Sequence, residues 1–99
     1  MSQRPASPAI GVRVPQYGST WEELRSFAAR AERLGFAGIW VNDHLQSPGR
    51  VKREPAFDAL TTLAALAALT RRPRLGVAVL SASYRPAALA AKMATVLDV

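Results

Sequence analysis

The sequence contains no cysteine, only one histidine and no long apolar run. The absence of cysteine excludes disulfide scaffolds, thiolate metal sites and cysteine nucleophiles, and it makes the cytosol the expected compartment. The single histidine argues against a histidine-rich metal centre, so no metal site is expected. The longest uncharged and largely apolar stretch, residues 60–69, is too short to cross a bilayer, so a membrane protein is not expected either.

Acidic residues are scarce: seven Asp and Glu stand against 13 Lys and Arg, which gives a formal net charge of +6. Such a balance raises the question of nucleic-acid binding. The basic residues are dispersed along the chain, however, so we expect no nucleic-acid partner. Arg50, Lys52 and Arg53 are either solvated loop cations or a site for a phosphate or the acidic tail of a cofactor.

The chain has the composition of a folded protein, with 49% hydrophobic and 20% charged residues. Residues 1–9 are rich in proline and polar residues and are expected to form a disordered tail. Beyond them, short apolar runs predict strands and longer amphipathic stretches predict helices. The predicted strands are residues 10–14, 38–42 and 75–80, and the predicted helices are residues 19–34, 57–70 and 86–97. Residues 45–56 are predicted to form a loop.

Local signals place the ends of the predicted helices. Ser19 and Glu22 have the spacing of a capping box at the start of the first helix, and Gly35 is suited to the left-handed position that closes it. Pro86 is typical of the first turn of the third helix. The pattern leaves open whether Trp40 packs under helices or faces the opposite side of the sheet, and whether Arg13 is directed inward or into solvent.

The order β-α-β-α-β-α predicts parallel strands joined by helical crossovers. An open doubly wound sheet and a piece of a (β/α)₈ barrel both fit this order. Residues 15–19 lack the glycine-rich turn of a dinucleotide-binding domain. We therefore expect an α/β fold in which residues 10–99 form the first three β/α units of a (β/α)₈ barrel, truncated before the fourth strand. Because the sheet edges of such a piece are unpaired, residues 1–99 alone are expected to be marginally stable or prone to aggregate.

In parallel α/β folds the active site lies at the carboxyl ends of the strands. Residues 15–17, 42–44 and 81–83 are expected there. His44 is the best single candidate, because imidazoles titrate near neutral pH and can exchange protons with a substrate. Asp43 can accept hydrogen bonds from a ligand. The alternative is that Asp43 caps a turn and His44 is an ordinary loop residue.

Several segments together resemble one known family. Residues 35–45, Gly-Phe-Ala-Gly-Ile-Trp-Val-Asn-Asp-His-Leu, resemble the second strand of the luciferase-like monooxygenase superfamily in its coenzyme F420-dependent branch. Residues 57–76 and 85–98 are similar to the helix and strand that follow and to the third helix. The resemblance covers residues 10–98, and the ordered series of segments is more specific than any single motif.

The resemblance implies a (β/α)₈ barrel that holds a flavin or deazaflavin at the carboxyl ends of its strands. It assigns His44 as the catalytic proton donor or as a ligand near the reactive carbon of the cofactor. It also implies that Asp43 hydrogen-bonds the cofactor ring and that Ser81 contacts it. The bond between Ala78 and Val79 corresponds to a non-proline cis peptide that lies behind the ring in some members.

The expected function is that of an oxidoreductase which transfers hydride between coenzyme F420 and a small organic substrate. Family members that use FMN more often carry Glu in place of Asp43, so the deazaflavin is favoured. The alternatives are an FMN-dependent monooxygenase that uses O₂ and a non-catalytic remnant or interaction module. Family members continue beyond Val99, so the sequence is expected to be an N-terminal fragment that is inactive alone. A homodimer of the full-length form is left open.

Overall fold

The computed structural model describes residues 8–47 and 55–99, which alternate between strand and helix as predicted. The elements are β1 (Gly11–Arg13), α1 (Trp21–Arg33), β2 (Gly38–Val41), α2 (Ala59–Leu69), β3 (Arg74–Val77) and α3 (Ala87–Leu97). The prediction of an α/β fold is confirmed. The three units are compatible with part of a (β/α)₈ barrel, and they do not form a closed one.

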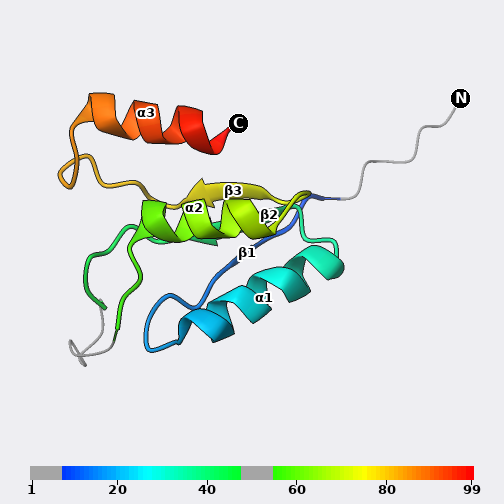
Figure 1. Ribbon diagram of the computed structural model, residues 1–99. Coiled ribbons are helices and arrows are strands. Elements are labelled where there is room, and N and C mark those ends of the chain that lie inside the picture. The colour runs from blue at the N-terminus through cyan, green and yellow to red at the C-terminus, as the bar shows by residue number, and fades with distance from the viewer. Residues whose placement is uncertain (1–7, 48–54) are drawn as a thin grey trace, which may run out of the picture.

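The strands form one parallel sheet in the order β1-β2-β3. Val12 lies opposite Ile39, which in turn lies opposite Leu75. Because all three strands run in the same direction, their carboxyl ends share one edge, at the left of Figure 1. The three helices begin on that same side (Figure 1).

The hydrophobic core lies between the sheet and helices α1 and α2. Ile39 and Val41 of β2 are fully buried. They meet apolar side chains of the two helices, among which Leu24, Ala28, Ala31, Leu60, Leu63 and Leu66 are buried. Helix α3 has no buried residue and contributes Met93 and Leu97, both partly buried, to the edge of the core. The third unit is therefore the most loosely packed of the three.

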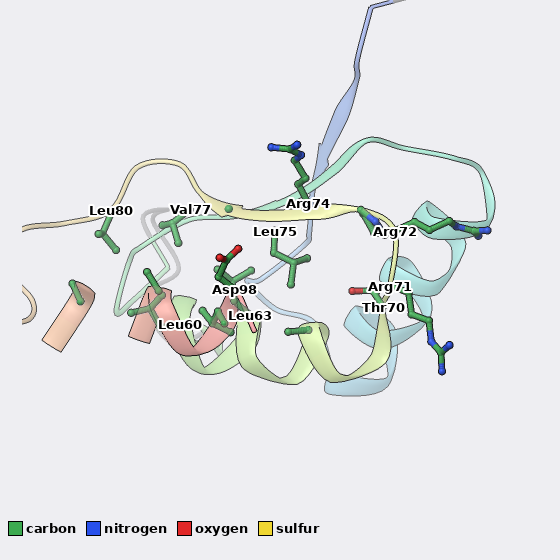
Figure 2. Close-up of a pocket in the computed structure, with 16 residues that line it drawn as sticks. Leu60, Leu63, Thr70, Arg71, Arg72, Arg74, Leu75, Val77, Leu80 and Asp98 are labelled. Atoms are coloured by element: carbon green, nitrogen blue, oxygen red, sulfur yellow. The ribbon is translucent and has the colours of Figure 1, made fainter. Parts of the chain in front are cut away.

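A cavity of about 800 Å³ separates α3 from α2 and β3. Figure 2 shows Leu75 and Val77 directed from β3 into this space, opposite Leu60 and Leu63 of α2, while Arg74 points to the other side of the strand. None of the predicted site residues lines the cavity. It lies in the helix layer and not at the carboxyl edge of the sheet.

Helix α1 begins one residue later than predicted. Thr20 is the N-cap, and its Oγ1 accepts a hydrogen bond from the backbone N–H of Glu23 at 3.1 Å. The predicted pair of Ser19 and Glu22 is therefore wrong by one position. The pairs Ser19–Glu22 and Thr20–Glu23 both fit the capping pattern. The chain turns at Gly18, which has a φ of 69°, and Thr20 is the last extended residue before the helix. At the other end, Gly35 has a φ of 82°, which confirms its predicted left-handed conformation.

Strand β3 ends at Val77, three residues before the predicted end. The chain turns at Ala78 and Val79, and the peptide bond between them is cis, as the resemblance implies. Val79 is 84% exposed and Leu80 is 43% exposed. The prediction of a strand over residues 75–80 is therefore wrong at its carboxyl end, because the chain leaves the sheet after Val77.

The carboxyl end of the predicted loop, residues 45–56, is bonded to the segment that follows β1. Ala56 forms an antiparallel bridge with Tyr17, and the N–H of Gly18 donates to the carbonyl of Pro55 at 2.9 Å. The basic cluster at residues 50–53 lies outside the described residues, as do residues 1–7 of the predicted tail. Among the described residues, no helix combines the length and the apolar character needed to cross a bilayer.

The face of the sheet opposite the helices carries Trp40, which resolves the first alternative left open above. Its indole is 41% exposed and lies against glycines of all three strands. A Cβ at Gly11 would come within 2.5 Å of the indole Nε1, and a Cβ at Gly76 would overlap the six-membered ring. Arg13 is the register partner of Trp40 in β1 and is exposed, so it lies on the same face.

Gly76→Ala is expected to lower the free energy of unfolding by about 1–3 kcal/mol, because the new methyl group displaces the indole of Trp40. In a Trp40→Ala background the same substitution should cost much less, since the overlapping ring is gone. Denaturant titration of the four proteins in this cycle measures the coupling. An equal loss in both backgrounds would show that the glycine is needed for another reason.

Candidate functional site

The carboxyl edge of the sheet is held together by a buried amide, that of Gln16. The side chain of Gln16 is 1% exposed and lies just beyond β1. Its Nε2 donates to the carbonyls of Asn42 at 2.9 Å and Phe57 at 3.1 Å, and its Oε1 accepts from the N–H of Asn42. This one side chain therefore joins the ends of β1 and β2 to the segment that leads into α2.

Asp43, the first residue of the predicted Asp-His pair, is buried and paired with Arg85. Arg85 Nη1 lies 2.7 Å from Asp43 Oδ2, and Arg85 Nη2 lies 2.9 Å from Oδ1. The backbone N–H of Ser81 donates to Oδ2 at 2.7 Å. The side chains of Asp43 and Arg85 are 1% and 8% exposed. The carboxylate thus fastens the end of β2 to the segment between β3 and α3.

The same contacts fix the ionisation of the pair. The hydrogen bond from the Arg85 guanidinium holds the pKa of Asp43 below its ordinary value; burial opposes this, and the Ser81 N–H adds to it. The pKa of Arg85 is raised by the same hydrogen bond. Asp43 is therefore ionised at neutral pH and can only accept hydrogen bonds. Three protein N–H groups already occupy most of its acceptor positions.

His44 points the other way. It is exposed, whereas Asp43 beside it is buried, so the two adjacent side chains have separate surroundings. The imidazole lies against the ring of Tyr17, with ring centroids 6.3 Å apart and planes inclined by 49°. His44 is therefore placed where a bound molecule can reach it, unlike the buried Asp43.

Tyr17 carries a buried hydroxyl that has no hydrogen-bond partner among the described residues. Burial raises the pKa of this phenol, and the nearby Asn42 side chain offsets part of the rise without forming a hydrogen bond of ordinary geometry. Buried polar groups are nearly always paired. Tyr17 is therefore a protonated donor, next to His44, whose hydrogen-bonding capacity is unused in the described structure.

The predicted cofactor-binding residues after β3 lie in one short segment. Ser81 is partly buried and is joined to Asp43 through its backbone N–H. The N–H of Ala78 donates to the carbonyl of Val41 at 2.9 Å, while Val79 is exposed. The structure thus brings Ser81 together with Asp43 and ties Ala78 to the end of β2. That these residues contact a cofactor stays a prediction.

Two residues of this edge were missed or undervalued in the sequence. The sequence predicts that Gln16 lies at this edge but indicates no role for it. Arg85 falls only within the segment that resembles the third helix of the family. Arg85 contacts a residue 42 positions earlier in the chain, and no local pattern marks such a partner. In residues 8–47 and 55–99, no group of three or more His, Asp or Glu side chains is arranged to hold a metal ion.

Comparisons with known proteins point to one family. A family described as luciferase-like monooxygenase matches residues 6–99. The F420-dependent glucose-6-phosphate dehydrogenases of Kineococcus radiotolerans and Amycolatopsis mediterranei are 40% and 37% identical to this chain over 75 residues. That of Beutenbergia cavernae is 40% identical over the same length. Each alignment covers 74% of this chain and 22% of the relative, so the chain matches about a fifth of the length of these curated relatives.

Proposed function

Because the chain belongs to the luciferase-like monooxygenase family, we propose that the whole protein is an oxidoreductase that uses coenzyme F420. It transfers hydride between the cofactor and a small organic substrate. The names of the relatives support the choice of cofactor, since proteins 37–40% identical to this chain are F420-dependent dehydrogenases. The chain covers only a small share of these relatives, so the activity proposed is that of the whole protein.

The observation that carries the proposal is an exposed imidazole at the carboxyl edge of the sheet, next in sequence to a buried ion pair. His44 is open to a ligand, while Asp43 and Arg85 are buried and paired with each other. The polar groups of this edge fit a deazaflavin ring, which carries carbonyl oxygens and a ring N–H. The Ser81 hydroxyl, on a partly buried residue, can donate or accept hydrogen bonds there.

The roles of the residues follow from their positions. When bound, a deazaflavin supplies a carbon that accepts or gives up a hydride. If an alcohol is oxidised, its hydroxyl proton must leave as the hydride is transferred, and an imidazole nitrogen of His44 takes that proton. Because His44 is exposed, it can pass the proton on to solvent. Ser81, Ala78 and Val79 are the residues that would hold the ring of the cofactor.

The substrate class is a further part of the proposal. The relatives are named for glucose 6-phosphate, and this sugar phosphate is the first substrate to test.

The proposal is tested by titrating the whole protein with coenzyme F420 and, separately, with FMN. We expect F420 to bind and FMN to bind much more weakly, and glucose 6-phosphate to bleach the absorbance of the oxidised deazaflavin. Tight FMN binding without F420 binding would replace the proposal with a flavin-dependent monooxygenase. Binding of neither cofactor would favour the non-catalytic alternative.

A further inference from the structure

We propose that Arg85 is a positioning residue of the cofactor site. Together with the Asp43 carboxylate and the backbone N–H of Ser81 it forms a unit, called here the clamp, that fixes the surface on which the cofactor ring rests. This inference rests on the proposed function for its ligand. Its geometry rests on contacts among described residues alone.

The clamp is rigid because its ion pair is two-pronged and buried. Two parallel N–H···O bonds of 2.7 and 2.9 Å join the guanidinium of Arg85 to both oxygens of Asp43. Such a fork fixes the plane of the carboxylate as well as its position, which a single point charge cannot do. With side chains 8% and 1% exposed, neither partner is free to turn toward solvent.

The clamp holds one end of the segment that follows β3. At its start, the N–H of Ala78 is bonded to the carbonyl of Val41. At its far end, the N–H of Ser81 is bonded to Asp43. Arg85 lies directly before Pro86, the N-cap of α3, so the same ion pair also anchors the start of that helix. Loss of the ion pair would release residues 79–86 while the tie at Ala78 remained.

The burial of Asp43 decides how it acts on a ligand. Its side chain is 1% exposed, and three N–H groups of the protein occupy its oxygens. A ligand therefore meets what Asp43 holds in place, above all Ser81, and not the carboxylate itself. Asp43 and Arg85 then act as one unit, so removing both should weaken cofactor binding no more than removing Asp43 alone.

The test uses the whole protein carrying Asp43→Ala, Arg85→Ala or both, with F420 affinity measured by fluorescence titration. We expect each single variant to weaken binding by about 10–100-fold, the loss typical when residues that orient the ligands of a metal are removed. The double variant should bind no more weakly than Asp43→Ala alone. Lys92→Ala, which removes an exposed charge from α3, is the matched control and should bind as the wild type does.

A second readout needs no cofactor. Hydrogen exchange of the Ser81 amide should accelerate in Arg85→Ala and less so in Arg85→Lys, which keeps the charge and loses the fork. In Lys92→Ala it should not change. The amides of β2 report global unfolding in the same samples, so acceleration confined to Ser81 and its neighbours separates the clamp from a general loss of stability.

Two results would overturn the clamp. Losses of affinity that add up in the double variant would show that Asp43 and Arg85 act on the cofactor independently and not as one clamp. Unchanged exchange at Ser81 in folded Arg85→Ala or Arg85→Lys would show that the ion pair does not hold this segment. If the wild-type protein binds no F420, the proposed function fails, and the exchange of Ser81 still decides whether the clamp exists.

Discussion

Asp43→Asn is expected to lower the free energy of unfolding by about 3–5 kcal/mol. The substitution keeps the shape of the side chain but leaves the guanidinium of Arg85, which is 8% exposed, without its counter-ion. A buried charge without a partner costs far more than the pair contributes when it is intact. Equilibrium unfolding in urea, followed by tryptophan fluorescence, measures the loss in the whole protein.

The control for this prediction is Asp98→Asn, which changes an exposed carboxylate at the end of α3. It should alter stability by no more than about 0.5 kcal/mol. A similarly small effect of Asp43→Asn would mean that the ion pair is dispensable for folding. It would also weaken the case that Arg85 is held rigidly.

The loss caused by Asp43→Asn should depend on pH in a defined direction. Because the folded-state pKa of Asp43 lies below its ordinary value of 3.8, the ionised carboxylate stabilises the fold above that value. This stabilisation is lost as the pH falls through the folded-state pKa. The stability gap between wild type and Asp43→Asn should thus be constant near neutral pH and narrow below about pH 4. A gap that widened in acid would contradict the assigned cause.

His44→Asn is expected to lower kcat of the whole enzyme by about 10²–10⁴-fold, the usual contribution of a positioned acid or base. Asparagine retains hydrogen-bonding groups of similar reach but cannot take up a proton at working pH. The dissociation constant for F420 should change little, because His44 is exposed and lies outside the clamp. Steady-state turnover and cofactor titration of the same preparation give both numbers.

The pH profile distinguishes proton transfer from a steric effect of the His44 substitution. If His44 carries the proton, the limb of kcat/KM that reports the free enzyme's essential base should disappear in His44→Asn. An unchanged profile with a reduced kcat would assign the proton to another group, and the Tyr17 hydroxyl next to His44 is then the first to test. A kcat within twofold of wild type would remove His44 from the mechanism.

The order and type of the helices and strands could be predicted from the local pattern of the amino-acid sequence. Apolar runs of β-branched residues marked the strands, and helical spacing marked the helices, because both signals are local. Gly35 could be assigned to a helix end for the same reason, since a left-handed backbone is a property of one residue. Parallel strands follow from that order, so the shared carboxyl edge with Asp43 and His44 could also be predicted.

Other features were decided by the tertiary structure. Ser19 and Thr20 are equally good caps by pattern, and the turn at Gly18 selects Thr20. Trp40 lies on the helix-free face because glycines of neighbouring strands leave room for the indole there. Neither the N-cap of α1 nor the face on which Trp40 lies can be predicted from the spacing of residues within one helix or strand.

The clamp is the clearest example of a feature that depends on the tertiary structure. Asp43 could be assigned to the edge from its place after β2, but its partner Arg85 lies 42 positions away, beyond a helix, a strand and a turn. Their meeting depends on how the crossover sets β3 beside β2 and on the direction the chain takes after Val77. A local sequence pattern predicts contacts between residues a few positions apart. A buried ion pair between distant segments forms only once the sheet has been assembled.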